Sequence, residues 1–145
     1  MSKTLEIYSD GASRGNPGVS AIGVVIKEKG KVVKEISQGI GEATNNVAEY
    51  TALIYALQES LVLKADQIKV HTDSELLFNQ LKGTYKVKNE KLKLLYSQLQ
   101  HLAKGFKKVE MKLVPREKNR EADRLASQAI KKEQAKVVAP TFRFS

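Results

Sequence analysis

Four acidic residues stand where a carboxylate can do chemistry: Asp10, Glu49, Asp73 and Asp123. We expect Asp10 and Asp73 to end strands, and Glu49 and Asp123 to lie in the first turns of helices on their apolar stripes. Strand ends and helix starts meet at one edge of an α/β sheet, where ligands usually bind. The four carboxylates are therefore expected to converge at that edge.

Converging carboxylates repel one another, which raises some of their pKa values unless cations join them. Magnesium is the natural complement, because it prefers oxygen ligands and leaves room for water and a substrate phosphate. Two such ions about 3.5–4 Å apart can activate a water and stabilise the leaving oxygen of a phosphodiester. The pattern predicts two Mg²⁺ per site, with Mn²⁺ as a substitute.

Each acid also has a purely structural alternative, which the residue types alone leave open. Glu49 fits a capping box with Asn46, and Asp73 fits a helix cap beside Ser74. Asp123 fits a favourable charge at a helix N-terminus, and Asp10 fits a turn.

The elements that must position these acids follow from hydrophobic period and turn residues. A glycine-rich loop is expected at 11–18, and Lys29-Gly30-Lys31 joins two strands as a hairpin. Expected strands are 4–10, 19–29, 31–41, 67–72 and 109–114; expected helices are 46–62, 74–81, 89–104 and one from the Asn119 cap to about 136. This βββαβααβα order indicates a mixed α/β sheet with helices against its faces.

Composition bounds the class of protein. The 145 residues suit one domain, and the net charge of +9 is compatible with a polyanionic partner. Residues 1–73 have a net charge of −1 and residues 74–145 one of +10. The positions of Asp10, Glu49 and Asp73 in the first part therefore do not simply reflect an acidic composition. The chain has no cysteine, which excludes disulfides and thiolate sites. It has no signal-peptide stretch or membrane-length apolar run, so we expect a cytoplasmic protein without membrane contact.

Four segments resemble the motif blocks of type 1 ribonucleases H, in order and spacing. They are SDGASRGNPG (9–18), ATNNVAEYTAL (43–53), HTDSELL (71–77) and VPREKNREADRLA (114–126). The resemblance implies the ribonuclease H-like fold, a five-stranded mixed sheet of order 3-2-1-4-5 flanked by helices. It also implies endonucleolytic hydrolysis of the RNA strand of RNA–DNA hybrids, leaving 5′-phosphate and 3′-hydroxyl ends.

The same resemblance implies roles for individual residues. Asp10, Glu49, Asp73 and Asp123 would be the catalytic metal ligands, with Asp10 bridging two ions. The loop and the segment after it would contact substrate along the RNA minor groove, where 2′-hydroxyls distinguish RNA from DNA; these residues are Gly11, Ser13, Arg14, Gly15, Asn16 and Asn45. Thr44 would hold a DNA phosphate, Ser74 would lie beside the metal site and Glu75 near the minor groove. The structural alternative for the loop is an ordinary turn; Thr44 and Ser74 are also expected as helix caps, a role compatible with substrate contact.

Two departures from the family pattern stand out. The loop before the last helix has no histidine, and Arg116 occupies about that place. Arginine cannot serve as a general base, so Arg116 is expected to steady phosphate or move product away. A basic protrusion is also missing, and only residues 82–88 join the two middle helices. Lys86 and Lys88, with Lys82 and Tyr85, are expected to contact the substrate backbone instead, or else to form a solvated charge run.

We expect residues 1–140 to form a single ribonuclease H domain and 141–145, with Phe142 and Phe144, a short tail. The expected partner is an RNA–DNA hybrid, with double-stranded RNA as an alternative, and the expected state is a monomer. One rival function is a catalytically silent relative that only binds hybrid or double-stranded RNA. Another is an integrase-like or resolvase-like nuclease of the same fold. His71 and His101 are expected to be core or solvated residues rather than a catalytic pair.

Overall fold

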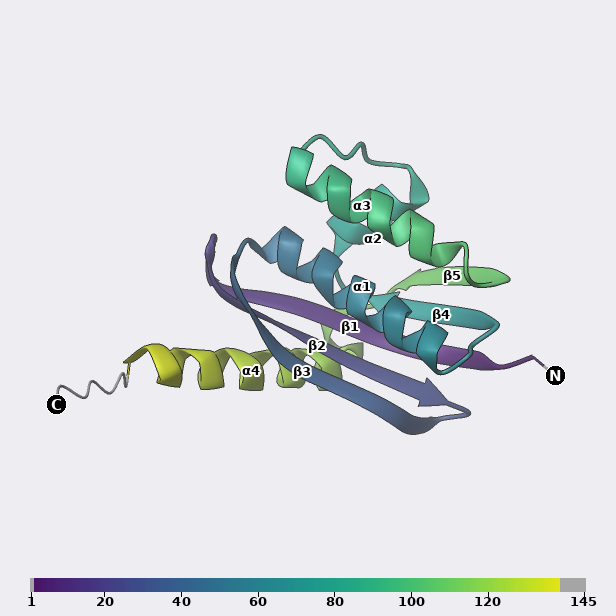
Figure 1. The fold of residues 1–145 in the computed structure, drawn as a ribbon, viewed down its shortest axis with the longest axis horizontal. Helices are drawn as coiled ribbons and strands as arrows, with labels where there is room; N and C mark the ends of the chain where they lie inside the picture. The colour runs from purple at the N-terminus through teal and green to yellow at the C-terminus, as the bar shows by residue number, and fades with distance from the viewer. Residues whose placement is uncertain (1, 139–145) are drawn as a thin grey trace, which may run out of the picture.

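The computed structural model describes residues 2–138 as a five-stranded sheet of order β3-β2-β1-β4-β5 with helices on both faces (Figure 1). The β1–β2 and β2–β3 pairs are antiparallel, whereas β1–β4 and β4–β5 are parallel. The predicted fold class and strand order are confirmed. The elements are β1 (Thr4–Gly15), β2 (Gly18–Glu28), β3 (Lys31–Ala43), α1 (Asn45–Val62), β4 (Gln67–Thr72), α2 (Glu75–Lys82), α3 (Glu90–Ala103), β5 (Lys108–Leu113), the 3₁₀ turn η1 (Arg116–Lys118) and α4 (Arg120–Val138).

Alternating side chains divide the core between the two faces of the sheet. On one face, Leu5 and Ile22 pack with α1 and α3 in the main apolar cluster. On the other face, Ala21 packs against Ala129 and Ile130 of α4. The tail at 141–145, with Phe142 and Phe144, lies outside the described residues. Within residues 2–138, no helix is long and apolar enough to cross a membrane.

The glycine-rich loop expected at 11–18 is wrong, because β1 and β2 stay paired almost to their tip. Gly11 lies opposite Ile22 and Gly15 lies opposite Gly18, so only residues 16 and 17 form the turn. Gly15 has a φ of +102°, and a Cβ at Gly18 would lie 2.0 Å from the Arg14 carbonyl oxygen. The glycines therefore permit a tight hairpin tip rather than interrupting the strands.

The capping box expected from Asn46 and Glu49 is also wrong. Helix α1 begins one residue earlier, and the Thr44 hydroxyl accepts a hydrogen bond from the Val47 N–H at 3.2 Å. Thr44 therefore satisfies one of the unpaired N–H groups at the start of the helix. The Glu49 side chain accepts a hydrogen bond from β1 instead.

Candidate active site

A cleft opens where β1 and β4 separate. Parallel pairing between the two strands ends at Tyr8 and His71, and Asp10 and Asp73 each lie two residues farther along. We expected Asp10 to end its strand, but β1 continues to Gly15. Asp10 instead lies just beyond the end of the pairing between β1 and β4. Glu49 of α1 reaches the same point, and one carboxylate oxygen from each of the three acids lies within 4.8 Å of the other two.

Gly11 sets how closely α1 approaches β1. A Cβ at this position would lie 2.2 Å from the carbonyl carbon of Ala48, too close for any side chain. The Gly11 N–H instead donates a 2.7 Å hydrogen bond to Oε1 of Glu49. The backbone contact and this hydrogen bond together fix the Glu49 carboxylate beside Asp10.

Gly23 has the same effect on the opposite helix. It pairs with Asp10 across β1 and β2, and a Cβ there would lie 2.0 Å from the carbonyl oxygen of Ala122 in α4. Asp123 follows Ala122 directly. Helix α1, which carries Glu49, therefore packs over Gly11 next to Asp10, and helix α4, which carries Asp123, packs over Gly23 opposite Asp10.

Burial and mutual repulsion dominate the electrostatics of the cluster. Asp10 is only 7% exposed, and its pKa is raised first by burial and then by the charges of Glu49 and Asp73. Burial also raises the pKa of Glu49, although the Gly11 N–H opposes that shift. The pKa of Asp73 is raised by burial and lowered in part by the Arg116 guanidinium. The fold therefore brings together carboxylates that oppose one another's ionisation.

The donor set fits a divalent cation. Carboxylate oxygens are the ligands that Mg²⁺ and Mn²⁺ accept, and positive charge between the three acids would offset both their repulsion and their lost hydration. Among residues 2–138, Asp10, Glu49 and Asp73 are the group of acidic or histidine side chains close enough to share one ion.

Asp123 lies in the same cleft and raises the pKa of Asp10 through a side-chain hydrogen bond and through its charge, although it is not part of the group whose oxygens all lie within 4.8 Å of one another. The Asp123 Oδ1 lies 3.9 Å from Nη2 of Arg116, whose side chain is 81% exposed. The cleft has a volume of about 780 Å³. Its lining includes Asp10, Gly11, Ser13, Arg14, Asn45, Glu49, Asp73, Glu75, Arg116 and Asp123, together with Ala12, Leu113, Val114, Pro115, Ser127 and Ile130, which the sequence had not indicated.

The other predicted substrate residues lie outside that lining. These are Gly15, Asn16, Thr44, Ser74, Lys86 and Lys88. The expected helix caps at Thr44 and Ser74 are confirmed, since each hydroxyl accepts from a backbone N–H at the start of its helix, and capping leaves their substrate roles open as predictions. The Asn16 Oδ1 accepts a 3.0 Å hydrogen bond from the Asn45 N–H, so the hairpin tip supports the segment that lines the cleft.

Asn119 has a supporting role that sequence reasoning missed. It is 1% exposed, and its Nδ2 donates a 2.9 Å hydrogen bond to the carbonyl of Ser9. Its amide also lowers the pKa of Asp73 through a hydrogen bond. The expected side-chain cap is wrong, because Asn119 Oδ1 has no hydrogen-bond partner within residues 2–138. Its side chain instead ties the start of α4 to β1 beside Asp10.

The two histidines do not form a catalytic pair. The His71 ring is buried, stacks on Tyr8 with a centroid distance of 4.3 Å, and places Nδ1 3.1 Å from the Ile7 carbonyl oxygen. His101 is exposed on α3. The prediction that the two histidines are core or solvated residues is confirmed, His71 being the core residue and His101 the solvated one.

Comparisons with known proteins agree with this geometry. The family model described as reverse transcriptase-like matches residues 8–129. The bifunctional protein Rv2228c of Mycobacterium tuberculosis is 44% identical over 126 residues, which are 86% of this chain and 35% of that protein. The chain thus spans about a third of that relative's length. Ribonuclease HI of Halobacterium salinarum is 41% identical over 127 residues, 87% of this chain and 64% of that protein.

Solved structures give the same picture. The crystal structure of RNase H1 from Halobacterium salinarum superposes with a TM-score of 0.87 at 39% identity, covering 89% of this chain and 98% of that one. LC11-RNase H1, isolated from compost by a metagenomic approach, has been solved in complex with an RNA/DNA hybrid. It superposes with a TM-score of 0.84 at 42% identity, covering 90% of this chain and 99% of that one.

Proposed function

The chain belongs to the type 1 ribonuclease H family, and from that premise we propose that it hydrolyses the RNA strand of RNA–DNA hybrids. The observation that carries the proposal is the cluster of Asp10, Glu49 and Asp73 within 4.8 Å, set in an open cleft. The hybrid complex of LC11-RNase H1 supports the substrate class.

Asp10, Glu49 and Asp73 would hold two divalent cations, with Asp10 serving both and Asp123 completing the ligand set. Bound there, the cations would supply an activated water and stabilisation of the leaving 3′-oxygen of the phosphodiester, and the expected products carry 5′-phosphate and 3′-hydroxyl ends. The Gly11 N–H orients Glu49, and Asn119 holds β1 to the helix that carries Asp123. Arg116 offers a cation at the mouth of the cleft that can steady the phosphate or the product.

Selection of RNA would fall to the side of the cleft formed by the β1–β2 hairpin and the start of α1. Ser13, Arg14 and Asn45 lie there and offer donors and acceptors to 2′-hydroxyls. Asn16 accepts a hydrogen bond from the Asn45 N–H, so it would contribute to RNA selection by holding Asn45 in place.

The test is cleavage of labelled RNA–DNA hybrid with Mg²⁺ or Mn²⁺, compared with double-stranded RNA, duplex DNA and an EDTA control. We expect cleavage of the RNA strand of the hybrid, dependent on metal. Binding of hybrid without cleavage under every metal condition would favour a catalytically silent relative. Equal cleavage of duplex DNA and hybrid would favour a different nuclease of the same fold.

A further inference from the structure

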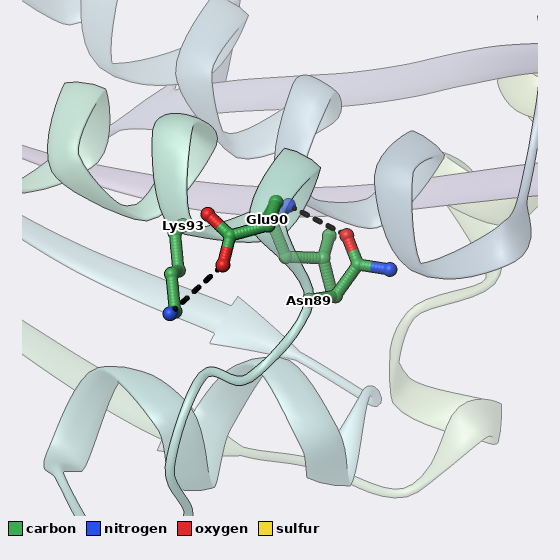
Figure 2. Close-up of polar contacts among 4 residues, drawn as sticks. Asn89, Glu90 and Lys93 are labelled. Atoms are coloured by element: carbon green, nitrogen blue, oxygen red, sulfur yellow. Dashed lines mark hydrogen bonds and ion pairs between the residues drawn. The ribbon is translucent and has the colours of Figure 1, made fainter.

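The basic connector, residues 83–88, is held at both ends by backbone and cap hydrogen bonds. At its start, the Asn79 carbonyl accepts from the N–H groups of Thr84 and Tyr85 at 2.9 and 3.1 Å. At its end, Asn89 caps α3 by accepting from the Leu92 N–H at 3.0 Å, next to the Glu90–Lys93 ion pair (Figure 2). The connector is therefore a defined loop rather than a loose charge run.

A buried side-chain amide fixes the middle of the same loop. Gln80 is 5% exposed, and its Nε2 donates a 3.2 Å hydrogen bond to the Lys86 carbonyl. Its Oε1 accepts a 2.5 Å hydrogen bond from the hydroxyl of Tyr50, which is fully buried in α1 next to Glu49. Because the Lys86 carbonyl can only accept, the Gln80 amide has one orientation and the Tyr50 hydroxyl must donate.

The consequence is that neighbouring side chains of the connector point in different directions. Val87 packs against the main apolar cluster, while Lys86 and Lys88 on either side of it are exposed. Tyr85 is also exposed, and Lys82 at the end of α2 is exposed with its Nζ 5.1 Å from the Phe78 ring centroid. Three lysines and an aromatic ring on one short stretch suit a nucleic-acid backbone.

We propose that Gln80, held by Tyr50, is a positioning residue for substrate binding: it fixes the Lys86 backbone so that the connector binds the polyanionic backbone of the hybrid. This inference rests on the proposed function for the identity of the substrate. The residue that controls this binding surface is thus buried, belongs to no motif block and does not touch the substrate. It also links the surface to α1, the helix that supplies Glu49.

The experiment compares Gln80→Met and Tyr50→Phe with wild type. Gln80→Met keeps the length of the side chain but removes both hydrogen bonds, and Tyr50→Phe removes only the hydroxyl. The hybrid dissociation constant is measured in EDTA over a salt series, and KM and kcat are measured with Mg²⁺. Tyr55→Phe is the matched control. It also removes a tyrosine hydroxyl from α1, but that hydroxyl contacts a different glutamine, Gln38.

We expect Gln80→Met to raise the dissociation constant and KM about three- to ten-fold, the size of effect typical of losing the hydrogen bond that holds the Lys86 carbonyl, with kcat within about two-fold of wild type. Tyr50→Phe should show a smaller change in the same direction, and Tyr55→Phe none. The log–log salt dependence of binding should flatten. In a background that already carries Lys86→Ala and Lys88→Ala, Gln80→Met should have little further effect, because the two changes act on one surface.

Two outcomes overturn the inference. One is a wild-type salt slope and dissociation constant in both variants while the fold is intact by circular dichroism. The other is an equal effect of Gln80→Met with and without the lysines, which would assign it to general destabilisation. If wild type binds hybrid but does not cleave it, the proposed function fails, whereas the binding comparison still tests the role of Gln80.

Discussion

The three-acid cluster and the basic connector each concentrate charges of one sign, but the fold treats them in opposite ways. Asp10, Glu49 and Asp73 are brought together where burial and repulsion oppose their ionisation. Lys86 and Lys88 keep their charges in water, and only the backbone between them is fixed. The contrast indicates that ionised acids in the cluster lower the stability of the fold until a cation binds between them, whereas the exposed lysines of the connector have little effect on stability.

The strongest way to break the contrast is to remove one charge from the cluster. We expect Asp10→Asn to lower kcat for hybrid cleavage on the order of 1,000-fold or more, because the substitution removes the buried carboxylate that is proposed to serve both cations. Glu121→Gln, which removes an exposed carboxylate in the first turn of α4, should leave kcat near wild type. Near wild-type turnover of Asp10→Asn would remove Asp10 from the mechanism.

The same substitution should have the opposite effect on the stability of the metal-free protein. The pKa of Asp10 is raised from 3.8 to about 9, so its contribution to stability is present at acidic pH and is lost as the pH rises through that window. We expect Asp10→Asn to increase the free energy of unfolding in EDTA by about 1–2 kcal/mol at neutral pH.

Urea denaturation of wild type and Asp10→Asn at acidic, neutral and alkaline pH measures this effect. The difference between the two proteins should grow with pH, and Mg²⁺ should stabilise wild type more than the variant. A difference that is constant with pH would mean that the Asp10 carboxylate is not held against its ionisation.

A smaller effect is expected when charge is removed from the connector. Lys86→Ala together with Lys88→Ala should raise KM about five-fold and reduce the log–log salt slope by about 1–2, because each lysine that neutralises a phosphate releases counterions. The matched control, Lys104→Ala with Lys107→Ala, removes two exposed charges after the opposite end of α3. If the control pair flattens the slope equally, net charge rather than the connector carries the effect.

Arg116 combines features of both regions, because it is an exposed cation like the connector lysines but lies beside Asp123 in the cleft. Its side chain is largely in water and its Nη2 lies 3.9 Å from Asp123 Oδ1, so Arg116→Ala should lower kcat by no more than about five-fold. Arg116→Lys should recover part of that loss if charge is what matters. Single-turnover rates measure it, and a loss comparable with that of Asp10→Asn would assign Arg116 a direct part in the chemical step.

The convergence of Asp10, Glu49 and Asp73 could be predicted from sequence, since hydrophobic period locates the elements and connection rules place them in the sheet. That Asp123 shares the cleft but stays outside the group whose oxygens lie within 4.8 Å of one another could not be predicted. It depends on how α4 packs over Gly23, which no local pattern encodes. The glycine-rich segment misled for a related reason, because composition does not distinguish a loop from a paired hairpin with glycines at its tip.

Supporting residues were harder still. Asn119 and its partner Ser9 are 110 residues apart, and Tyr50 and Gln80 are 30 apart. Asn119 is typical of a helix cap in sequence, and Gln80 lies within a short amphipathic helix. Their hydrogen bonds exist only once the sheet and helices have assembled, so a single sequence carries no signal for them.

The two glycines beside and opposite Asp10 have a consequence for mutational surveys. Positions 11 and 23 offer no functional group, yet any side chain there would displace the backbone of α1 or α4. A saturation screen for variants that lose the proposed activity should therefore return both positions together with the acids, in molecules that keep all four carboxylates. Tolerance at these two sites therefore reports how closely α1 and α4 must approach the sheet, a requirement that no functional group reveals.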